Sequence, residues 1–262
     1  MKSVLGYILA ALLIASCAAA YCQFIVEPDN FYHLAHARHY WEQGPFNTDF
    51  PYAAYSAVAE KQSDLWWGFH VLLSPLTLIP DKTLLLAVAP GVMLFLYMLI
   101  CRAVMTTLQL NPWFGLAMLP ASGSFFQRMD TVRPQALSAP LLLLVAAGLA
   151  ANSISVTLIA AAAIGILHPT LSYMVVLVAL ASLFAKRVTR AKGKLWAELL
   201  APVVAMGLAC VRPNPIAGLE LLKIQLFDLF MVKKAGEVTN FGSELAPATM
   251  NYFMSAMLGP II

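Results

Sequence analysis

Charged side chains are scarce in this sequence. Asp, Glu, Lys and Arg together make up only 11% of its 262 residues, whereas soluble domains contain about 25%. Hydrophobic residues make up 61%, and the mean hydropathy is +0.77. This composition excludes an ordinary soluble domain and predicts an integral membrane protein made of helices. The net charge of +3 is small and no basic tract alternates with aromatic residues, so we expect no nucleic-acid partner.

Cysteine is also rare, and its spacing argues against two kinds of site. The four cysteines, Cys17, Cys22, Cys101 and Cys210, lie in or beside apolar segments. Their spacing is typical neither of a zinc site nor of a disulfide framework. We interpret them as small apolar packing residues. Internal repeats and low-complexity linkers are absent from the sequence too, so we treat residues 1–262 as a single module.

Long apolar runs dominate the sequence. The first follows Lys2 and covers residues 4–26, enough to cross a hydrocarbon layer of about 30 Å. We interpret it as an uncleaved anchor, although it also resembles a signal peptide or, at residues 14–17, a lipoprotein cleavage box. Six further runs cover residues 84–101, 112–127, 134–150, 153–167, 169–185 and 195–211. The predicted fold is therefore all-α, with about seven spans and a long first outer loop at residues 27–82.

The run at residues 66–79 is not counted as a span. It is short, Pro75 interrupts it, and it begins with aromatic residues that favour the headgroup region. A basic segment at residues 186–194 contains five Lys and Arg residues and no acid, which places it in the cytoplasm. With the N-terminus also cytoplasmic, this placement requires residues 66–79 to lie in the interface rather than cross the membrane.

The resulting topology gathers polar residues on one face. It places the loop 27–82, the turn 127–133, His168 and the segment after Val211 outside. We therefore predict a single outward site built from these segments. The alternative is that the ends of the loops carry charged residues simply because they are exposed to water.

Two predictions concern the ends of the last spans. Residues 216–232 form an amphipathic run that we expect to lie along the membrane surface. The apolar residues 250–262 are too few to cross a bilayer. We therefore expect the chain to be the N-terminal part of a longer protein, unless this end packs against the other helices.

At the cytoplasmic side, Glu198 is expected to pair with the basic segment.

Polar residues are concentrated just after the first span. Asp29, His33 and His36 stand at i, i+4 and i+7, so they share one face of a helix, with Tyr40 on its edge. Asp29 is then a candidate general base that His33 orients, or the three side chains are candidate ligands of a divalent metal. The alternative is a solvated amphipathic helix that happens to contain histidines.

Two other outer positions carry ionisable groups. Asp130 stands between Arg128 and Arg133, which can hold it ionised or bind a phosphate in a bidentate manner. Snorkelling of the arginines to headgroups is the alternative. His168-Pro169 interrupts an apolar stretch, and an ionisable residue near a membrane is a candidate functional group. The competing interpretation of His168 is a histidine that caps a helix end.

These motifs together carry a resemblance. Residues 27–34 read Glu-Pro-Asp-Asn-Phe-Tyr-His-Leu, an Asp-x-x-Tyr-His-like motif at the start of the first outer loop. Asp130 follows in the next outer loop, and Arg133-Pro134-Gln135 comes directly after it. In these features the chain resembles the GT-C superfamily of membrane glycosyltransferases. This group includes oligosaccharyltransferase catalytic subunits, protein O-mannosyltransferases and aminoarabinose transferases.

The resemblance implies an activity and a location. Enzymes of this group take a sugar from a polyprenyl-phosphate or polyprenyl-diphosphate carrier. They transfer it to a lipid, glycan or protein acceptor, with inversion of the anomeric centre. The implied location is the bacterial inner membrane, with a cytoplasmic N-terminus and a periplasmic active face. Membrane lipids and partner subunits complete the expected partners.

The resemblance also implies roles for individual residues. Asp29 would be the base that activates the acceptor, with His33 beside it and Asp130 assisting. In members that use a metal, Asp29 and Asp130 would hold Mg²⁺ or Mn²⁺, but this first loop lacks the second adjacent carboxylate of an Asp-x-Asp pair. The residues expected to contact the substrate or its phosphate are Tyr32, His36, Arg128, Arg133, His168, Arg212 and Lys233.

Two other functions compete with this interpretation. One is a non-catalytic membrane subunit that binds a lipid carrier or partner proteins. The other is a transporter or lipid flippase, which would favour ionisable residues deep inside the spans. The charges of this sequence stay near the ends of the apolar runs, which argues against a path for ions through the middle of the membrane.

Overall fold

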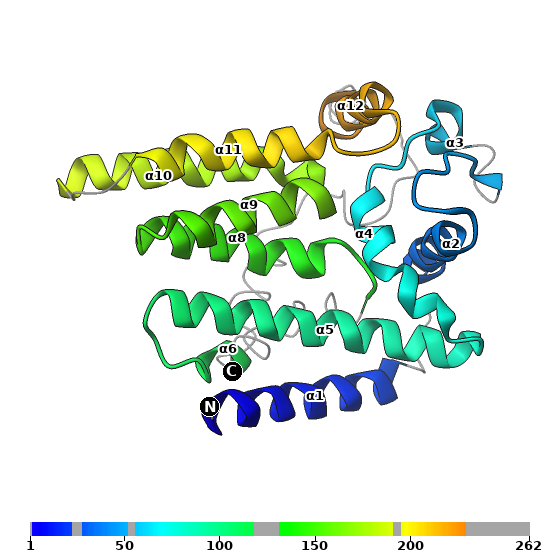
Figure 1. Ribbon diagram of the computed structural model, residues 1–262, viewed down its shortest axis with the longest axis horizontal. Coiled ribbons are helices and arrows are strands. Elements are labelled where there is room, and N and C mark those ends of the chain that lie inside the picture. The colour runs from blue at the N-terminus through cyan, green and yellow to red at the C-terminus, as the bar shows by residue number, and fades with distance from the viewer. Residues whose placement is uncertain (1, 23–27, 52–55, 118–130, 191–194, 229–262) are drawn as a thin grey trace, which may run out of the picture.

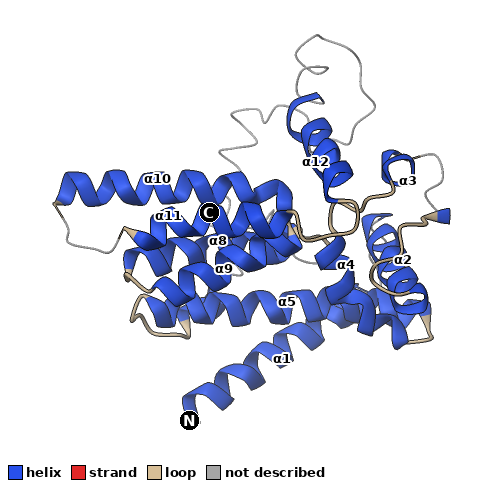
Figure 2. Ribbon diagram, turned by 45° about the horizontal axis from the view of Figure 1, so that its top comes forward, coloured by secondary structure: helices blue, strands red, loops and turns tan. Residues whose placement is uncertain are grey.

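The computed structural model describes residues 2–22, 28–51, 56–117, 131–190 and 195–228. The regular secondary structure within these residues consists of helices. Eleven α-helices occur within these residues (Figure 1). α1, α5, α8, α9, α10 and α11 lie side by side in one stack (Figures 1 and 2). α2 (Pro28–Gln43), α3 (Ala57–Lys61), α4 (Trp67–Leu73) and α12 (Pro215–Lys223) gather at one end of it, whereas α6 (Phe114–Ala117) lies near the other. The all-α prediction is confirmed for the described part of the chain.

The stack is built by successive neighbours. α1 packs along α5, α5 along α8, α8 along α9, and α9 along α11, while α10 packs against α11 and α8. The bounds of these helices are Lys2–Cys22 for α1, Lys82–Thr107 for α5, Gln135–Ala150 for α8, Ile154–Leu167 for α9, Ser172–Thr189 for α10 and Trp196–Ala209 for α11.

Three segments are long and apolar enough to cross a membrane. They are Val4–Tyr21 within α1, Lys82–Thr107, and Pro169–Thr189, in which the short helix η3 (Pro169–Leu171) leads into α10. α8, α9 and α11 are equally apolar but contain only 16, 14 and 14 residues. The predicted run 112–127 begins with α6 (Phe114–Ala117), and residues 118–127 lie outside the described residues.

The predicted ends of the runs differ from the structure in one notable case. We expected a span at 84–101, but α5 continues to Thr107. Asp81 caps its beginning, where the side chain accepts a hydrogen bond of 2.8 Å from the backbone N–H of Leu84. Arg102 lies within the helix, and its guanidinium lies over the ring of Tyr7 of α1, 5.7 Å from the centroid.

The stack has two distinct ends. The beginning of α5, the beginning of α8, His168 after α9 and the end of α11 meet at one end, together with α2 (Pro28–Gln43) and α4 (Trp67–Leu73) (Figure 1). The other end holds the chain's N-terminus and the end of α10. This arrangement agrees with the predicted grouping of the loop 27–82, His168 and the segment after Val211.

The end of α10 carries a buried ion pair. Lys186 Nζ lies 2.5 Å from Glu198 Oε1 of α11, and the two side chains are 13% and 0% exposed. Ser182 Oγ also donates to Glu198 Oε1 over 3.0 Å, and Lys186 donates to Asn152 Oδ1 over 2.8 Å. The predicted pairing of Glu198 with the basic segment is therefore confirmed.

Small residues let the central helices approach closely. A Cβ atom on Gly165 of α9 would collide with the backbone oxygen of Ala205 of α11. A Cβ atom on Gly68 of α4 would collide with Ile166 at the end of α9. Close contact through glycine and alanine is typical of helices that pack within membranes.

α2 and α4 are anchored in the core of the stack. Phe69 and Leu73 of α4 and Leu34 and Ala37 of α2 belong to the same buried cluster as the apolar residues of α8 and α9. α4 continues into the 3₁₀ helix η2 (Ser74–Leu78), where Pro75 stands in the first turn. Together they form the short element expected at residues 66–79.

The expected surface helix begins where predicted. Its structure is α12 (Pro215–Lys223), which continues as a π-helical turn over Ile224–Asp228. Lys61 of the short α3 (Ala57–Lys61) forms an ion pair of 3.0 Å with Glu220 of α12. The remainder of the predicted run 216–232, and the apolar end 250–262, lie outside the described residues.

Candidate functional site

The site is centred on the face of α2 that the sequence predicts. α2 has Pro28 in its first turn and ends before Gly44, whose φ of 91° is readily adopted only by glycine. His33, His36 and Tyr40 are buried on one face, with exposures of 4%, 0% and 3%. The helix is therefore not a solvated amphipathic helix, because its histidines point into the protein.

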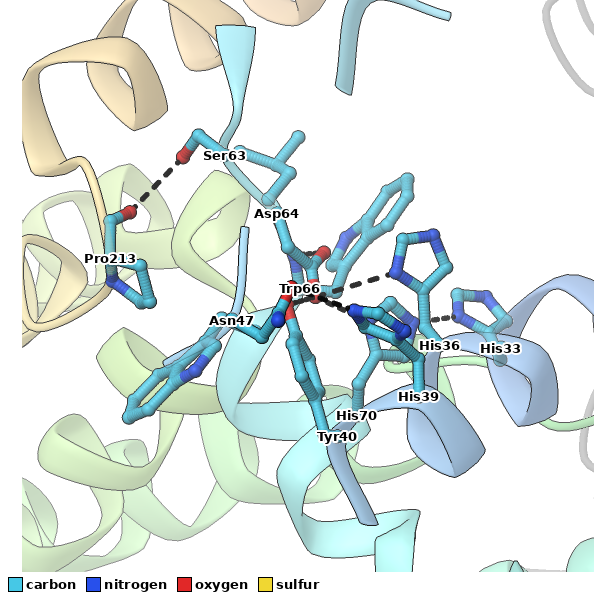
Figure 3. A network of polar contacts seen from close by, with 12 residues as sticks. His33, His36, His39, Tyr40, Asn47, Ser63, Asp64, Trp66, His70 and Pro213 are labelled. Atoms are coloured by element: carbon cyan, nitrogen blue, oxygen red, sulfur yellow. Dashed lines mark hydrogen bonds and ion pairs between the residues drawn. The ribbon is translucent and has the colours of Figure 1, made fainter. Parts of the chain in front are cut away.

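A hydrogen-bonded chain connects this face to α4. His33 Nδ1 lies 2.7 Å from His70 Nε2, and His70 Nδ1 lies 2.5 Å from Asp64 Oδ2. Tyr40 donates its hydroxyl proton to Asp64 Oδ2 over 3.0 Å, so α2 meets the same carboxylate again (Figure 3). The second oxygen of Asp64 accepts a hydrogen bond of 2.9 Å from the backbone N–H of Trp66.

His36 completes the cluster. Its Nδ1 atom lies 4.0 Å from Asp64 Oδ2, and its ring stacks on that of His70, with centroids 4.6 Å apart and planes 14° apart. Tyr32 packs edge-on against the rings of His33 and His36. We call His33, His36, Asp64 and His70 the histidine–aspartate cluster.

Burial and charge determine the protonation of this cluster. Burial, with a smaller contribution from nearby His70, lowers the pKa of His36 to about 3. Burial also lowers the pKa of His33 well below its usual range. Burial alone would raise the pKa of Asp64, but the attraction and hydrogen bond of His70 outweigh it and bring that pKa below its usual range. At neutral pH the cluster therefore contains an ionised carboxylate beside neutral rings of His33 and His36.

Arg212 holds the loop that carries Asp64. Its side chain is buried, and Nε donates to the carbonyl oxygen of Ala209 over 2.7 Å. Nη1 donates to the carbonyl oxygen of Leu65 over 2.8 Å and, more weakly, to that of Asp64 over 3.4 Å. Arg212 was predicted to bind a carrier phosphate. In the structure its Nε and Nη1 atoms donate to backbone carbonyl groups, so Arg212 positions the loop.

Asp29 lies at the rim of the site, beside the second predicted loop. Its Oδ2 atom lies 2.8 Å from Nη2 of Arg133, and the two side chains are 44% and 22% exposed. Asn30 accepts a hydrogen bond of 2.7 Å from the backbone N–H of Val132. The beginning of α2 and residues 131–133 are thus joined, as the prediction of a shared site requires.

His168 has different surroundings. It ends α9, is 3% exposed, and its Nδ1 atom lies 2.7 Å from Ser138 Oγ of α8. Its backbone N–H donates to the carbonyl oxygen of Ile164. Burial lowers its pKa to about 4. The contacts of His168 therefore join the end of α9 to α8.

Three predicted residues lie outside the described residues. They are Arg128, Asp130 and Lys233. Of the expected metal pair of Asp29 and Asp130, the described residue Asp29 has the guanidinium of Arg133 as its neighbour.

Asp64 and His70 are functional candidates that the sequence prediction missed. Asp64 lies in the first outer loop and His70 in the run at residues 66–79, but neither was among the predicted site residues. One signal was present, because His70 is the only ionisable residue between residues 66 and 79. His36, Asp64 and His70 each offer one ligand atom, and these atoms lie within 4.8 Å of one another, so the three residues could hold a metal ion.

The opposite side of α2 borders an open pocket. Its volume is about 510 Å³, and six of the eight residues that line it have polar or charged side chains. His39 Nε2 lies 3.0 Å from Asn47 Oδ1 at its wall. The lining residues are Ala35, Arg38, His39, Glu42, Gln43, Asn47, Asp49 and Pro51.

Comparison with known proteins adds no assignment. No protein-family model, curated protein or solved structure matches the chain.

Proposed function

We propose that the chain is a membrane glycosyltransferase that moves a sugar from a polyprenyl-phosphate donor to a lipid, glycan or protein acceptor. The observation that carries the proposal is the 2.8 Å ion pair of Asp29 with Arg133. It joins the first-loop acid to the Arg-Pro-Gln element, two of the features on which the resemblance to GT-C enzymes rests. Asp29 is also partly exposed, so an acceptor can reach its carboxylate.

The proposed transfer is a single displacement. The acceptor hydroxyl loses its proton to the Asp29 carboxylate while its oxygen attacks the anomeric carbon of the donor. The bond from that carbon to the carrier oxygen breaks, the phosphate leaves with the electron pair, and the anomeric centre is inverted. Arg133 orients Asp29, and the cations Arg128 and Lys233 stabilise the charge of the leaving phosphate.

The proposed step uses no metal at Asp29. The resemblance allows Mg²⁺ or Mn²⁺ at Asp29 and Asp130. However, the guanidinium of Arg133 lies 2.8 Å from Asp29 Oδ2, and a cation there would meet its positive charge. His33 acts as a positioning residue in this proposal, because it is 4% exposed and bonded to His70.

The proposed topology has seven spans with the active face in the periplasm of a bacterial inner membrane. The three long apolar segments supply part of it. α8, α9 and α11 are shorter, and 14 residues of helix cover only about 21 Å at 1.5 Å per residue. They would cross beside the longer helices where the bilayer thins locally. The basic end of α10, with Lys186 and Arg187, would face the cytoplasm.

Sugar transfer by variants tests the proposal. Membranes containing the full chain are supplied with a panel of radiolabelled polyprenyl-phosphate sugars, and labelled product is counted. Asp29→Asn should lower the rate by about 100-fold or more, as expected for loss of a general base. The matched control is Glu42→Gln, an exposed acid at the last turn of α2, which should keep the wild-type rate. Wild-type transfer by Asp29→Asn would refute Asp29 as the base.

A non-catalytic membrane subunit is the second candidate, and one observation favours it. The rings of His33 and His36 are nearly inaccessible and directed at other protein groups. The test is whether wild-type membranes transfer sugar from any donor of the panel. If they transfer none, while the purified chain retains a polyprenyl phosphate in detergent, the result supports a non-catalytic subunit rather than a glycosyltransferase.

A further inference from the structure

We propose that His36, Asp64 and His70 form a buried site for a transition-metal ion of the Zn²⁺ class, which fastens α2 to the first outer loop and to α4. This inference does not rest on the proposed sugar transfer. It also differs from the Mg²⁺ or Mn²⁺ expected at Asp29, because it uses other residues and another kind of ion.

The ligand types indicate the kind of ion. Two imidazole nitrogens and one carboxylate oxygen form a mixed nitrogen and oxygen set, which suits Zn²⁺ and its neighbours in the first transition row. Mg²⁺ and Ca²⁺ prefer oxygen atoms alone. Within the described residues, these three are the group whose ligand atoms come close enough to share an ion.

The distances require small adjustments. Ligand atoms around tetrahedral Zn²⁺ lie about 3.3 Å apart, from bond lengths near 2.0–2.1 Å. His36 Nδ1 is 4.0 Å from Asp64 Oδ2, so it would move inward by less than about 1 Å. His70 Nδ1 is 2.5 Å from the same oxygen, with a proton between them. The ion would replace that proton and move these two atoms apart by a similar amount.

The groups that would orient the ligands are already in place. His70 has its other ring nitrogen, Nε2, 2.7 Å from His33 Nδ1. The other oxygen of Asp64, Oδ1, accepts a hydrogen bond of 2.9 Å from the backbone N–H of Trp66. Bonds of this kind, from the far side of a ligand to a second residue, usually accompany metal-binding histidines and carboxylates. A carboxylate with 1% side-chain exposure also gains from a cation beside it.

Burial indicates a structural role for the ion. The side chains of His36, Asp64 and His70 are 0%, 1% and 0% exposed, so a substrate cannot approach the ion directly. The fourth position would be filled by a water molecule or by the Tyr40 oxygen, which lies 3.0 Å from Asp64 Oδ2. Because the ligands come from α2, the loop and α4, the ion would connect three segments of the chain.

Metal titration of the full-length protein tests the site. The purified chain in detergent is treated with a chelator and then titrated with Co²⁺, whose visible absorption reports tetrahedral nitrogen and oxygen ligands. Zn²⁺ is measured by elemental analysis after dialysis. We expect one ion per chain, competition between Zn²⁺ and Co²⁺, and no displacement by excess Mg²⁺. A wild-type protein that shows no stoichiometric Co²⁺ absorption would overturn the proposal.

Variants identify the ligands. His36→Ala should weaken Zn²⁺ binding by about 100-fold or more, whereas the matched control His39→Ala, on the same helix beside Asn47, should bind as wild type. Tyr40→Phe keeps the aromatic ring and should weaken Zn²⁺ binding by about 10-fold. It tests the site even if His36→Ala does not fold. Equal binding by wild type, His36→Ala and Tyr40→Phe would overturn the assignment. Asp29→Asn should still bind one Zn²⁺ ion per chain. The metal titration and the assay of sugar transfer therefore test the two proposals separately.

Discussion

His70 Nδ1 lies 2.5 Å from Asp64 Oδ2, and the opposite nitrogen of the same ring lies 2.7 Å from His33. One imidazole thus connects a loop carboxylate to the helix that follows the first span. Because Asp64 and His70 are almost fully buried, their bond is not weakened by water. It holds residues 28–43 and 64–73 in one arrangement, and the rim residue Asp29 depends on that arrangement for its place.

Removal of the Asp64 charge should destabilise the protein strongly. Asp64→Asn keeps the shape and one acceptor oxygen but removes the negative charge that faces His70 Nδ1. We expect a loss of about 3 kcal/mol in the free energy of unfolding, as for breaking a buried pair. Denaturation with sodium dodecyl sulfate in mixed micelles measures it. The exposed Asp49→Asn is the control and should change stability by less than about 0.5 kcal/mol. Similar losses for both variants would contradict the importance of the buried pair.

Acidification should destabilise the protein, in part through His168. Its pKa is about 4 in the folded state and about 6.5 in an unfolded chain, so the unfolded state binds more protons between these values. The contribution of His168 is complete above pH 6.5 and is lost as the pH falls toward 4, by up to about 3 kcal/mol. His168→Asn keeps a partner for Ser138 and should flatten the decline in stability between pH 7 and pH 5. Ser138→Ala should lower stability at both pH values and leave the slope unchanged. An equally steep decline in His168→Asn would contradict this account.

The helix at the centre of the site could be predicted because its signals are local. Pro28 at the start, Gly44 at the end and the spacing of Asp29, His33 and His36 all lie within one short segment. The inward direction of His33 and His36 could not be predicted, because it depends on what packs against them. The spacing is the same for a helix in water and for a helix buried against α4.

Asp64 and His70 illustrate what sequence reasoning could not supply. Asp64 stands 28 residues beyond His36, and His70 stands 37 residues beyond His33. Their pairing is created when the loop folds back on α2 and is fixed by Arg212, about 150 residues away. Such contacts follow from tertiary packing. The breaks between apolar runs, by contrast, were close to the observed helix ends, since Pro and Asn act on the backbone beside them.

Arg212 should contribute to stability through the loop it holds. Arg212→Met removes the bonds to the carbonyl groups of Ala209 and Leu65 and leaves these groups buried. We expect a loss of about 2–3 kcal/mol in the same denaturation assay. Arg187→Met, which removes an exposed arginine, is the matched control and should have little effect. If the two variants unfold alike, the bonds of Arg212 to the loop are not important for stability.

The buried pair of Lys186 and Glu198 should show strong coupling. Lys186→Met leaves the Glu198 carboxylate, which is 0% exposed, without its cation and should cost about 3–5 kcal/mol. The double variant Lys186→Met with Glu198→Leu removes both charges and should recover most of that loss. The exposed pair Lys61 and Glu220 is the comparison, and Lys61→Met should cost less than about 1 kcal/mol. Additive losses in the double variant would show that the two buried charges do not depend on each other.

Close packing of α9 on α11 should make Gly165 intolerant of a methyl group. In Gly165→Ala the added Cβ atom would meet the backbone oxygen of Ala205, which cannot move away as a flexible side chain could. We expect a loss of about 1–3 kcal/mol from separation of the two helices. Gly207→Ala is a matched control on α11, because a Cβ atom there meets nothing within 4 Å. It should be neutral or stabilise the helix by up to about 1 kcal/mol. Thermal unfolding in detergent compares the variants, and a Gly165→Ala protein as stable as Gly207→Ala would show that the interface between α9 and α11 can widen at no cost.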